Sequence, residues 1–178
     1  MSKFPKILFF MFVVSGAFPR ASQGDDEPPV KPSDFAALKA EVERLRGMVP
    51  DQSHAMKDVA YHFANLWFAG QKQNWPLAEF YLSETRSHLR WAVRIIPIRK
   101  TPQDQELRLE DVLTPLDKTV FTKLQEAIAA KNSDSFKGKY AETLNACYSC
   151  HVMAGKPYLR LQVPQMPEAA IIRFDPEP

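Results

Sequence analysis

Cysteine, glycine and long apolar runs are all scarce in this chain of 178 residues. The 2 cysteines are too few for a disulfide-rich secreted scaffold. No apolar run reaches the roughly 18 residues that a membrane-spanning helix needs. The 6 glycines make up about 3% of the chain, below the usual share of about 7%. The 15 prolines make up about 8%, above the usual share of about 5%. The charged fraction of 25% and hydrophobic fraction of 45% are those of a globular chain, and the length predicts one domain.

The first 24 residues have the features of a secretory signal peptide. Lys3 and Lys6 precede an apolar run over residues 7–18, and small residues follow at 21–24. The run is too short to span a bilayer and fits the apolar core of a signal. We predict cleavage after Gly24, with an uncleaved anchor as the alternative. Cleavage removes three basic residues and no acidic ones, which leaves 20 basic and 21 acidic residues and no sign of a nucleic-acid partner.

The prolines of the remaining chain mark where helices lie, because proline breaks helix interiors but is tolerated in the first turn. The intervals with apolar residues at helical spacing are 33–49, 51–75, 77–96 and 116–156. The last interval divides near Asn132; its first helix starts at Thr114 and Pro115, and its second at Ser133 or Asp134. Ser53 is the predicted cap of the second interval, and the third helix is predicted to open at Asn74 or Trp75, with Pro76 near its first position. No alternating pattern predicts a strand, so we predict an all-α fold.

The chemistry is indicated by one motif, Cys147-Tyr148-Ser149-Cys150-His151, the C-x-x-C-H pattern of a covalent c-type haem site. On a helix, three residues turn through about 300° and four through about 400°, so both thiols and the imidazole point to nearly the same side. Cys147 and Cys150 are therefore predicted to form thioethers to one haem c, with His151 binding its iron. A thioredoxin-like dithiol would need a preceding strand, and a structural zinc site would need a fourth ligand.

The motif lies close to the C-terminus, with 27 residues after His151. A C-terminal motif on the last helix of an antiparallel bundle resembles the class II cytochromes c, the cytochrome c′ family. The resemblance covers roughly residues 51–154 and implies an antiparallel four-helix bundle, with an additional N-terminal helix and an irregular tail. The predicted organisation is a signal peptide over 1–24, a linker and leading helix over 25–50, a haem-binding bundle over 51–155, and a Pro-rich tail over 156–178.

The sixth iron position is the main open question of this resemblance. In the low-spin branch of the family, a methionine on the first bundle helix binds the iron, whereas in cytochrome c′ proper the site stays open. Met56 resembles that methionine in placement, which implies Met56 and His151 as the two iron ligands. Met56 also belongs to an apolar helix face, where methionine commonly fills the core. The alternatives are His62, His88, Met166 and an open site, and we expect His54 to be exposed.

Further residues are predicted around the haem. Phe63, Trp67 and Tyr140 are expected to line its pocket. A row of arginines recurs every four residues along one helix edge: Arg86, Arg90 and Arg94. We expect this row either to pair with the haem propionates, to dock an acidic partner or to form a solvated face. The leading helix carries an apolar heptad pattern, so it either packs on the bundle or forms a homodimer seam.

These features predict an exported, periplasmic monohaem cytochrome c that carries single electrons between redox partner proteins and is not an enzyme. A Met/His ligand pair would give it a raised reduction potential. One alternative is a five-coordinate haem protein that senses or scavenges nitric oxide or carbon monoxide. Another is an accessory subunit with a largely structural haem.

Overall fold

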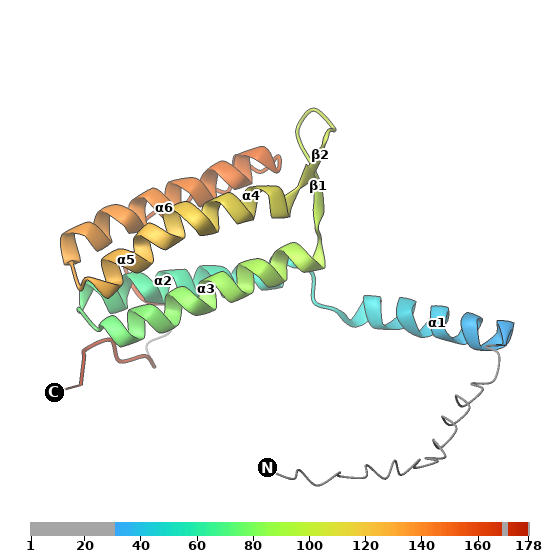
Figure 1. Ribbon diagram of the computed structural model, residues 1–178, viewed down its shortest axis with the longest axis horizontal. Helices are drawn as coiled ribbons and strands as arrows, with labels where there is room; N and C mark the ends of the chain where they lie inside the picture. Colours follow the sequence, from blue (N-terminus) through green and yellow to red (C-terminus); the bar gives the residue numbers. More distant parts are fainter. Residues whose placement is uncertain (1–30, 169–170, 178) are drawn as a thin grey trace, which may run out of the picture. The chain divides into compact units, whose positions relative to one another are not determined.

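The computed structural model describes residues 31–168 and 171–177, and these residues are mostly helical (Figure 1). The prediction of an all-α class is confirmed in this coarse form. The predicted signal peptide lies outside the described residues. No helix in the described ranges combines the length and the apolar character that crossing a bilayer requires.

The elements follow one another in a simple order. They are α1 (Pro32–Met48), α2 (Gln52–Gln71), α3 (Trp75–Ile95), β1 (Ile98–Lys100), β2 (Glu106–Arg108), α4 (Leu109–Leu116), a π-helical turn (Asp117–Phe121), α5 (Thr122–Ala129) and α6 (Ser133–Met153). The chain divides into two units after Arg44. Within α1, the predicted helix over 33–49 is present and none of its residues is buried.

Side-chain caps explain where the long helices begin. Asp51 caps α2 by accepting a hydrogen bond from the His54 N–H, whereas Ser53, the cap predicted from sequence, donates its hydroxyl to Asp51 instead. Asn74 caps α3 in the same way, at the predicted start of that helix, and Asn132 caps α6. An unpaired N–H in the first helical turn is thereby satisfied in each case.

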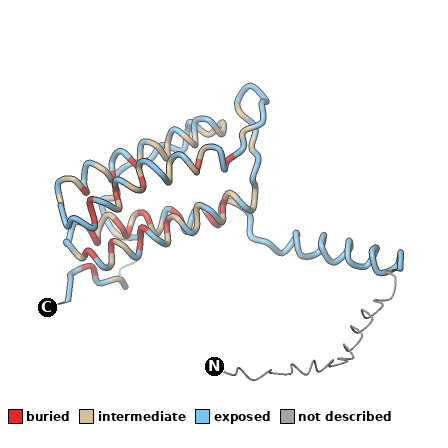
Figure 2. The backbone as a smooth tube through the Cα atoms, in the orientation of Figure 1, coloured by how far each residue is buried: buried red, intermediate tan, exposed pale blue. Residues whose placement is uncertain are grey.

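The helices after Pro50 pack around one apolar core. Helix α2 packs against α3 and α6, and α5 packs against α3 and α6. Buried positions recur along these helices, as Figure 2 shows in red. The largest apolar side chains that are almost completely buried come from five elements: Leu66, Leu82, Phe121, Leu124, Phe136 and Tyr140.

Two sequence predictions about residues 97–121 are wrong. First, a short hairpin is present, with β1 and β2 antiparallel and Arg99 opposite Leu107. Its strands have three residues each, which is too short to produce a recognisable alternation. Second, α4 begins at Leu109, so Pro115 lies inside a helix and not at its start. Proline has no N–H to donate, and the π-helical turn directly follows this break in the hydrogen-bond ladder.

The chain after α6 has no helix or strand among its described residues, but it returns to the core. Phe174 is buried and its ring lies 5.6 Å from that of Phe68. The Asn74 side chain donates to the Phe174 carbonyl, and Lys72 pairs with Asp175 at 2.9 Å. The end of the tail is therefore held against α2 and the start of α3.

Arg86 connects α3 to the segment around the π-helical turn. Its Nε lies 2.8 Å from Asp117 Oδ1, and its other nitrogens donate to Gln125 Oε1 and the Asp117 carbonyl. The side chain is 17% exposed, which leaves this ion pair partly desolvated. Its role is thus to join helices, and it does not belong to a solvated row with Arg90 and Arg94.

We expect Arg86→Ala to lower the free energy of unfolding by about 1–3 kcal/mol, because it leaves several polar groups without partners. Arg90→Ala, on the exposed face of the same helix, is expected to change it by less than about 0.5 kcal/mol. Urea denaturation followed by circular dichroism measures both. Equal effects of the two substitutions would contradict this assignment.

Candidate cofactor site

A cavity of about 700 Å³ lies among α2, α3, α4, α6 and the first part of the tail. This volume is within the range of about 300–1,000 Å³ that is usual for small-molecule and cofactor sites. Most of the lining side chains are apolar, including Val59, Leu89, Leu113, Leu116 and Leu144. The cavity therefore suits a large, mainly apolar ligand.

The C-x-x-C-H residues are among those that line this cavity. Cys147, Cys150 and His151 all lie in α6, which continues to Met153, so the predicted helical context of the motif is correct. Spacings of three and four residues bring side chains to one face of a helix. Both thiols and the imidazole thus line a common space.

The two thiols are free and partly buried. Burial raises the pKa of Cys147 to about 12, and the neighbouring Cys150 contributes to this rise. Burial also raises the pKa of Cys150. Because the thiolate is the species that attacks disulfides, neutral buried thiols disfavour a redox dithiol here.

His151 contacts the first part of the tail. Its Nδ1 lies 3.5 Å from the carbonyl oxygen of Leu159. This is long for a hydrogen bond, and Nδ1 would have to carry the proton to donate to this oxygen. This arrangement leaves Nε2 as the nitrogen with a free lone pair, as in histidine ligands oriented by a backbone carbonyl. Residues 159–162 and Pro164 also line the cavity, a contribution that the irregular sequence of the tail does not predict.

Three of the other predicted site residues also line the cavity: Met56, Phe63 and Tyr140. The rings of Phe63 and Tyr140 are stacked, with centroids 4.4 Å apart and planes at 8°. The Tyr140 hydroxyl donates to the Phe63 carbonyl at 2.9 Å, and burial raises its pKa. This part of the wall is consequently rigid and uncharged.

Trp67 is not one of the described residues that line the cavity. Its ring packs against Phe136 and Tyr140, at centroid distances of 6.1 and 4.9 Å. It supports the cavity wall from behind through Tyr140. Helical periodicity places Trp67 on the apolar face but does not separate core contacts from cavity contacts.

The structure also places the alternative iron ligands weighed from sequence. His62 and His88 are absent from the described residues that line the cavity, and their rings lie beside each other between α2 and α3. The His54 side chain is exposed, as expected, and bonds to Asp51. Met166 is 77% exposed. Met56 is the one of these residues that shares the cavity with His151.

The cavity has a basic lining that the sequence did not indicate. Four cationic side chains contribute to it: Lys57, Arg99, Lys156 and Arg160. Arg99 lies in β1 and donates through Nε to Gln52 Oε1 at 2.8 Å. These residues suit the binding of carboxylates at an otherwise apolar cavity. Arg99 reaches the cavity through the hairpin. Because the hairpin was not predicted from the sequence, Arg99 was not predicted as a lining residue either.

No protein-family model matches the chain, and none of the curated proteins or solved structures compared with it matches either.

Proposed function

We propose that this protein is a periplasmic monohaem cytochrome c of the class II, four-helix-bundle kind, which carries single electrons and is not an enzyme. The observation that carries the proposal is the cavity shared by Cys147, Cys150, His151 and Met56. Two thiols for thioethers and two neutral iron ligands form the donor set of a covalent Met/His haem site. The motif suggests three of these residues, and Met56 supports the proposal because it lines the same cavity.

The described residues fit a haem in several further respects. The cavity volume and apolar lining suit the macrocycle, and the basic side chains at Lys57, Arg99, Lys156 and Arg160 suit its two propionates. The packing of α2 on α3 and α6, and of α5 on α3 and α6, supports the bundle architecture of class II. The residues that would hold the haem lie on α2, β1, α6 and the tail, which are far apart in the sequence.

When bound, haem would supply the one-electron iron couple, and the chain would set its conditions. His151 would hold the iron through Nε2 while Nδ1 faces the Leu159 carbonyl. As an iron ligand, the thioether sulfur of Met56 would favour ferrous iron and raise the reduction potential. The stacked Phe63 and Tyr140 would exclude water from the same space. Each of these contributions suits a carrier whose ligands do not change with redox state.

Optical spectra with and without carbon monoxide test this function. We expect the wild-type protein to be low-spin in both redox states and inert to carbon monoxide, because both axial positions are filled. Met56→Ala should open the sixth position, giving high-spin ferrous iron that binds carbon monoxide completely. Met166→Ala, which changes an exposed methionine outside the cavity, should leave the wild-type spectra unchanged.

The same spectra separate the carrier from the alternatives. A wild-type ferrous protein that is high-spin and binds carbon monoxide at once would replace electron transfer by gas binding. A low-spin spectrum that survives in Met56→Ala would exclude Met56 as the ligand. Reversible one-electron oxidation and reduction of the purified protein completes the test, since an inert haem would indicate a structural role.

A further inference from the structure

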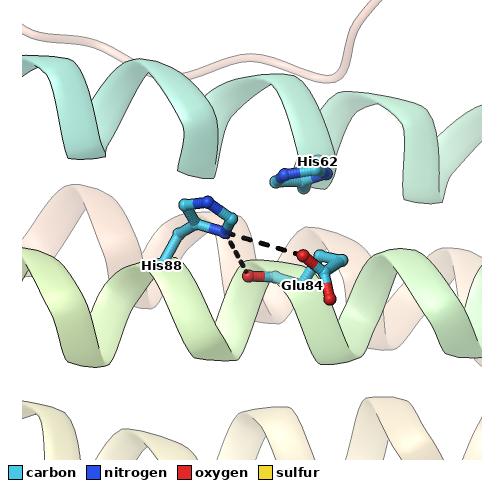
Figure 3. A group of neighbouring side chains, drawn as sticks. All are labelled: His62, Glu84 and His88. Atoms are coloured by element: carbon cyan, nitrogen blue, oxygen red, sulfur yellow. Dashed lines mark hydrogen bonds and ion pairs between the residues drawn. The ribbon is translucent and has the colours of Figure 1, made fainter.

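A second group of potential metal ligands lies between α2 and α3, outside the proposed haem cavity. It consists of His62 on α2 and of Glu84 and His88, one turn apart on α3 (Figure 3). One ligand atom from each residue lies within 4.8 Å of the other two. The imidazole rings are 4.7 Å apart at centroid, with their planes at 36°. Figure 3 shows both rings and the Glu84 side chain in the space between the two helices.

The two histidines have unused donor capacity. Nδ1 of His62 is buried and has no hydrogen-bond partner among the described residues. A buried polar atom without a partner is costly, and an ion or ordered water is a common explanation for it.

The hydrogen bonding of His88 is the kind found in metal-binding histidines. Its Nδ1 lies 3.0 Å from the Glu84 carbonyl oxygen and 4.0 Å from a Glu84 carboxylate oxygen (Figure 3), and an Nδ1–H that donates to the carbonyl would leave the lone pair on Nε2. Nε2 in turn lies 3.9 Å from Asp58 Oδ2 on α2. A ligating imidazole usually donates its other N–H to a carbonyl or carboxylate in this way, which fixes the ring. The Asp58 carboxylate therefore lies beside Nε2 of His88, at the edge of the three-residue cluster.

Charge and access also favour a cation. Glu84 and Asp58 together supply two negative charges beside two imidazoles. The side chains of His88 and Glu84 are 23% and 35% exposed, so an ion has access from solvent. Tetrahedral zinc, with bonds of about 2.0–2.1 Å, needs donor atoms roughly 3.4 Å apart. The ligand atoms of the cluster lie within 4.8 Å of one another, so a bound ion would draw them closer together.

We propose that His62, Glu84 and His88, with Asp58 beside them, bind one divalent transition-metal ion of the zinc class. Two imidazoles and a carboxylate are a donor set typical of zinc and other late first-row metals, and they do not suit magnesium or calcium. The ion would join α2 to α3 on the side of the helix pair that the haem does not use. This site is independent of the proposed cytochrome function.

Calorimetric titration with ZnCl₂ tests the site. The purified protein is used as produced, after a chelator has removed metal ions other than any haem iron. We expect one zinc per chain, and His62→Ala, His88→Ala and Glu84→Gln should each weaken binding by at least about tenfold. His54→Ala is the matched control, because it removes an exposed histidine of α2 outside the cluster. Circular dichroism verifies folding, and His62→Gln and His88→Gln keep much of the ring volume if the alanine variants unfold.

Zinc-edge X-ray absorption distinguishes this site from the C-x-x-C-H motif. The proposed site predicts only nitrogen and oxygen neighbours near about 2.0–2.1 Å, including histidine, whether or not haem is attached. Sulfur neighbours at about 2.3 Å would assign the zinc to Cys147 and Cys150 and overturn the proposal. Wild-type binding no tighter than that of the His62 and His88 variants would overturn it as well.

Discussion

Replacing both Cys147 and Cys150 by alanine is expected to abolish covalent haem attachment completely. Each thioether needs one of these sulfurs, and the described residues contain no other cysteine. Haem held only by His151, Met56 and apolar contacts would leave the protein in acidified acetone, whereas thioether-bound haem would stay. Extraction followed by a haem stain of the denatured protein measures the difference.

Ser149→Ala is the matched control for this prediction. Ser149 lies between the two cysteines on the same helix, is exposed, and donates its hydroxyl to the Asn145 carbonyl. It has no part in attachment, so this variant should retain all its haem after extraction. Retention of haem by the double cysteine variant would contradict the assignment of the motif, and so would its loss from Ser149→Ala.

Gly70→Ala is expected to destabilise the fold strongly. A methyl group at Gly70 would meet the ring of Phe136 at 2.2 Å, far inside van der Waals contact. Phe136 is completely buried and packed among the rings of Trp67, Trp75 and Tyr140, so it has little room to move. Overpacking of this kind costs about 1–3 kcal/mol or more, and each kcal/mol lowers Tm by roughly 2–4 °C in a chain of this size.

Gly138→Ala, on α6, is expected to have the opposite effect on stability. No atom lies within 4 Å of a methyl group built at Gly138, and the residue is exposed inside the helix. Alanine there should stabilise the protein by about 0.5–1 kcal/mol, because glycine is a poor helix former. Thermal unfolding of both variants tests the packing. A Gly70→Ala variant as stable as wild type would show that Phe136 yields, and would contradict the close contact of α2 and α6.

The long helices were predictable because their information is local. The second and third proline intervals, 51–75 and 77–96, each correspond to one helix, and α3 begins at Trp75, within the predicted start at Asn74 or Trp75. The start of α4 was predicted wrongly at Pro115, because proline commonly occupies the first turn of a helix. The apolar residues Leu109, Leu113 and Leu116 already have helical spacing before and around this proline. That pattern, spaced by four and three residues, is the signal that identifies α4.

Other features depend on contacts between distant residues, which local patterns do not contain. Phe174 is buried against Phe68, which lies more than a hundred residues earlier in the chain. Arg99 reaches the cavity through a hairpin too short to predict. His62 and His88 were each weighed as an iron ligand from sequence, whereas the structure places them beside each other. The spacing of Glu84 and His88 on one helix face was the available signal for their cluster.

The central claim, a haem covalently bound at Cys147 and Cys150, is tested most directly by mass spectrometry. The protein is produced in a bacterial host that attaches haem c in its periplasm, and the peptide containing residues 147–151 is isolated after proteolysis. We predict that this peptide carries the mass of one haem and that fragmentation assigns the haem to both cysteines. A peptide with two unmodified thiols, or with a disulfide between them, would contradict the account.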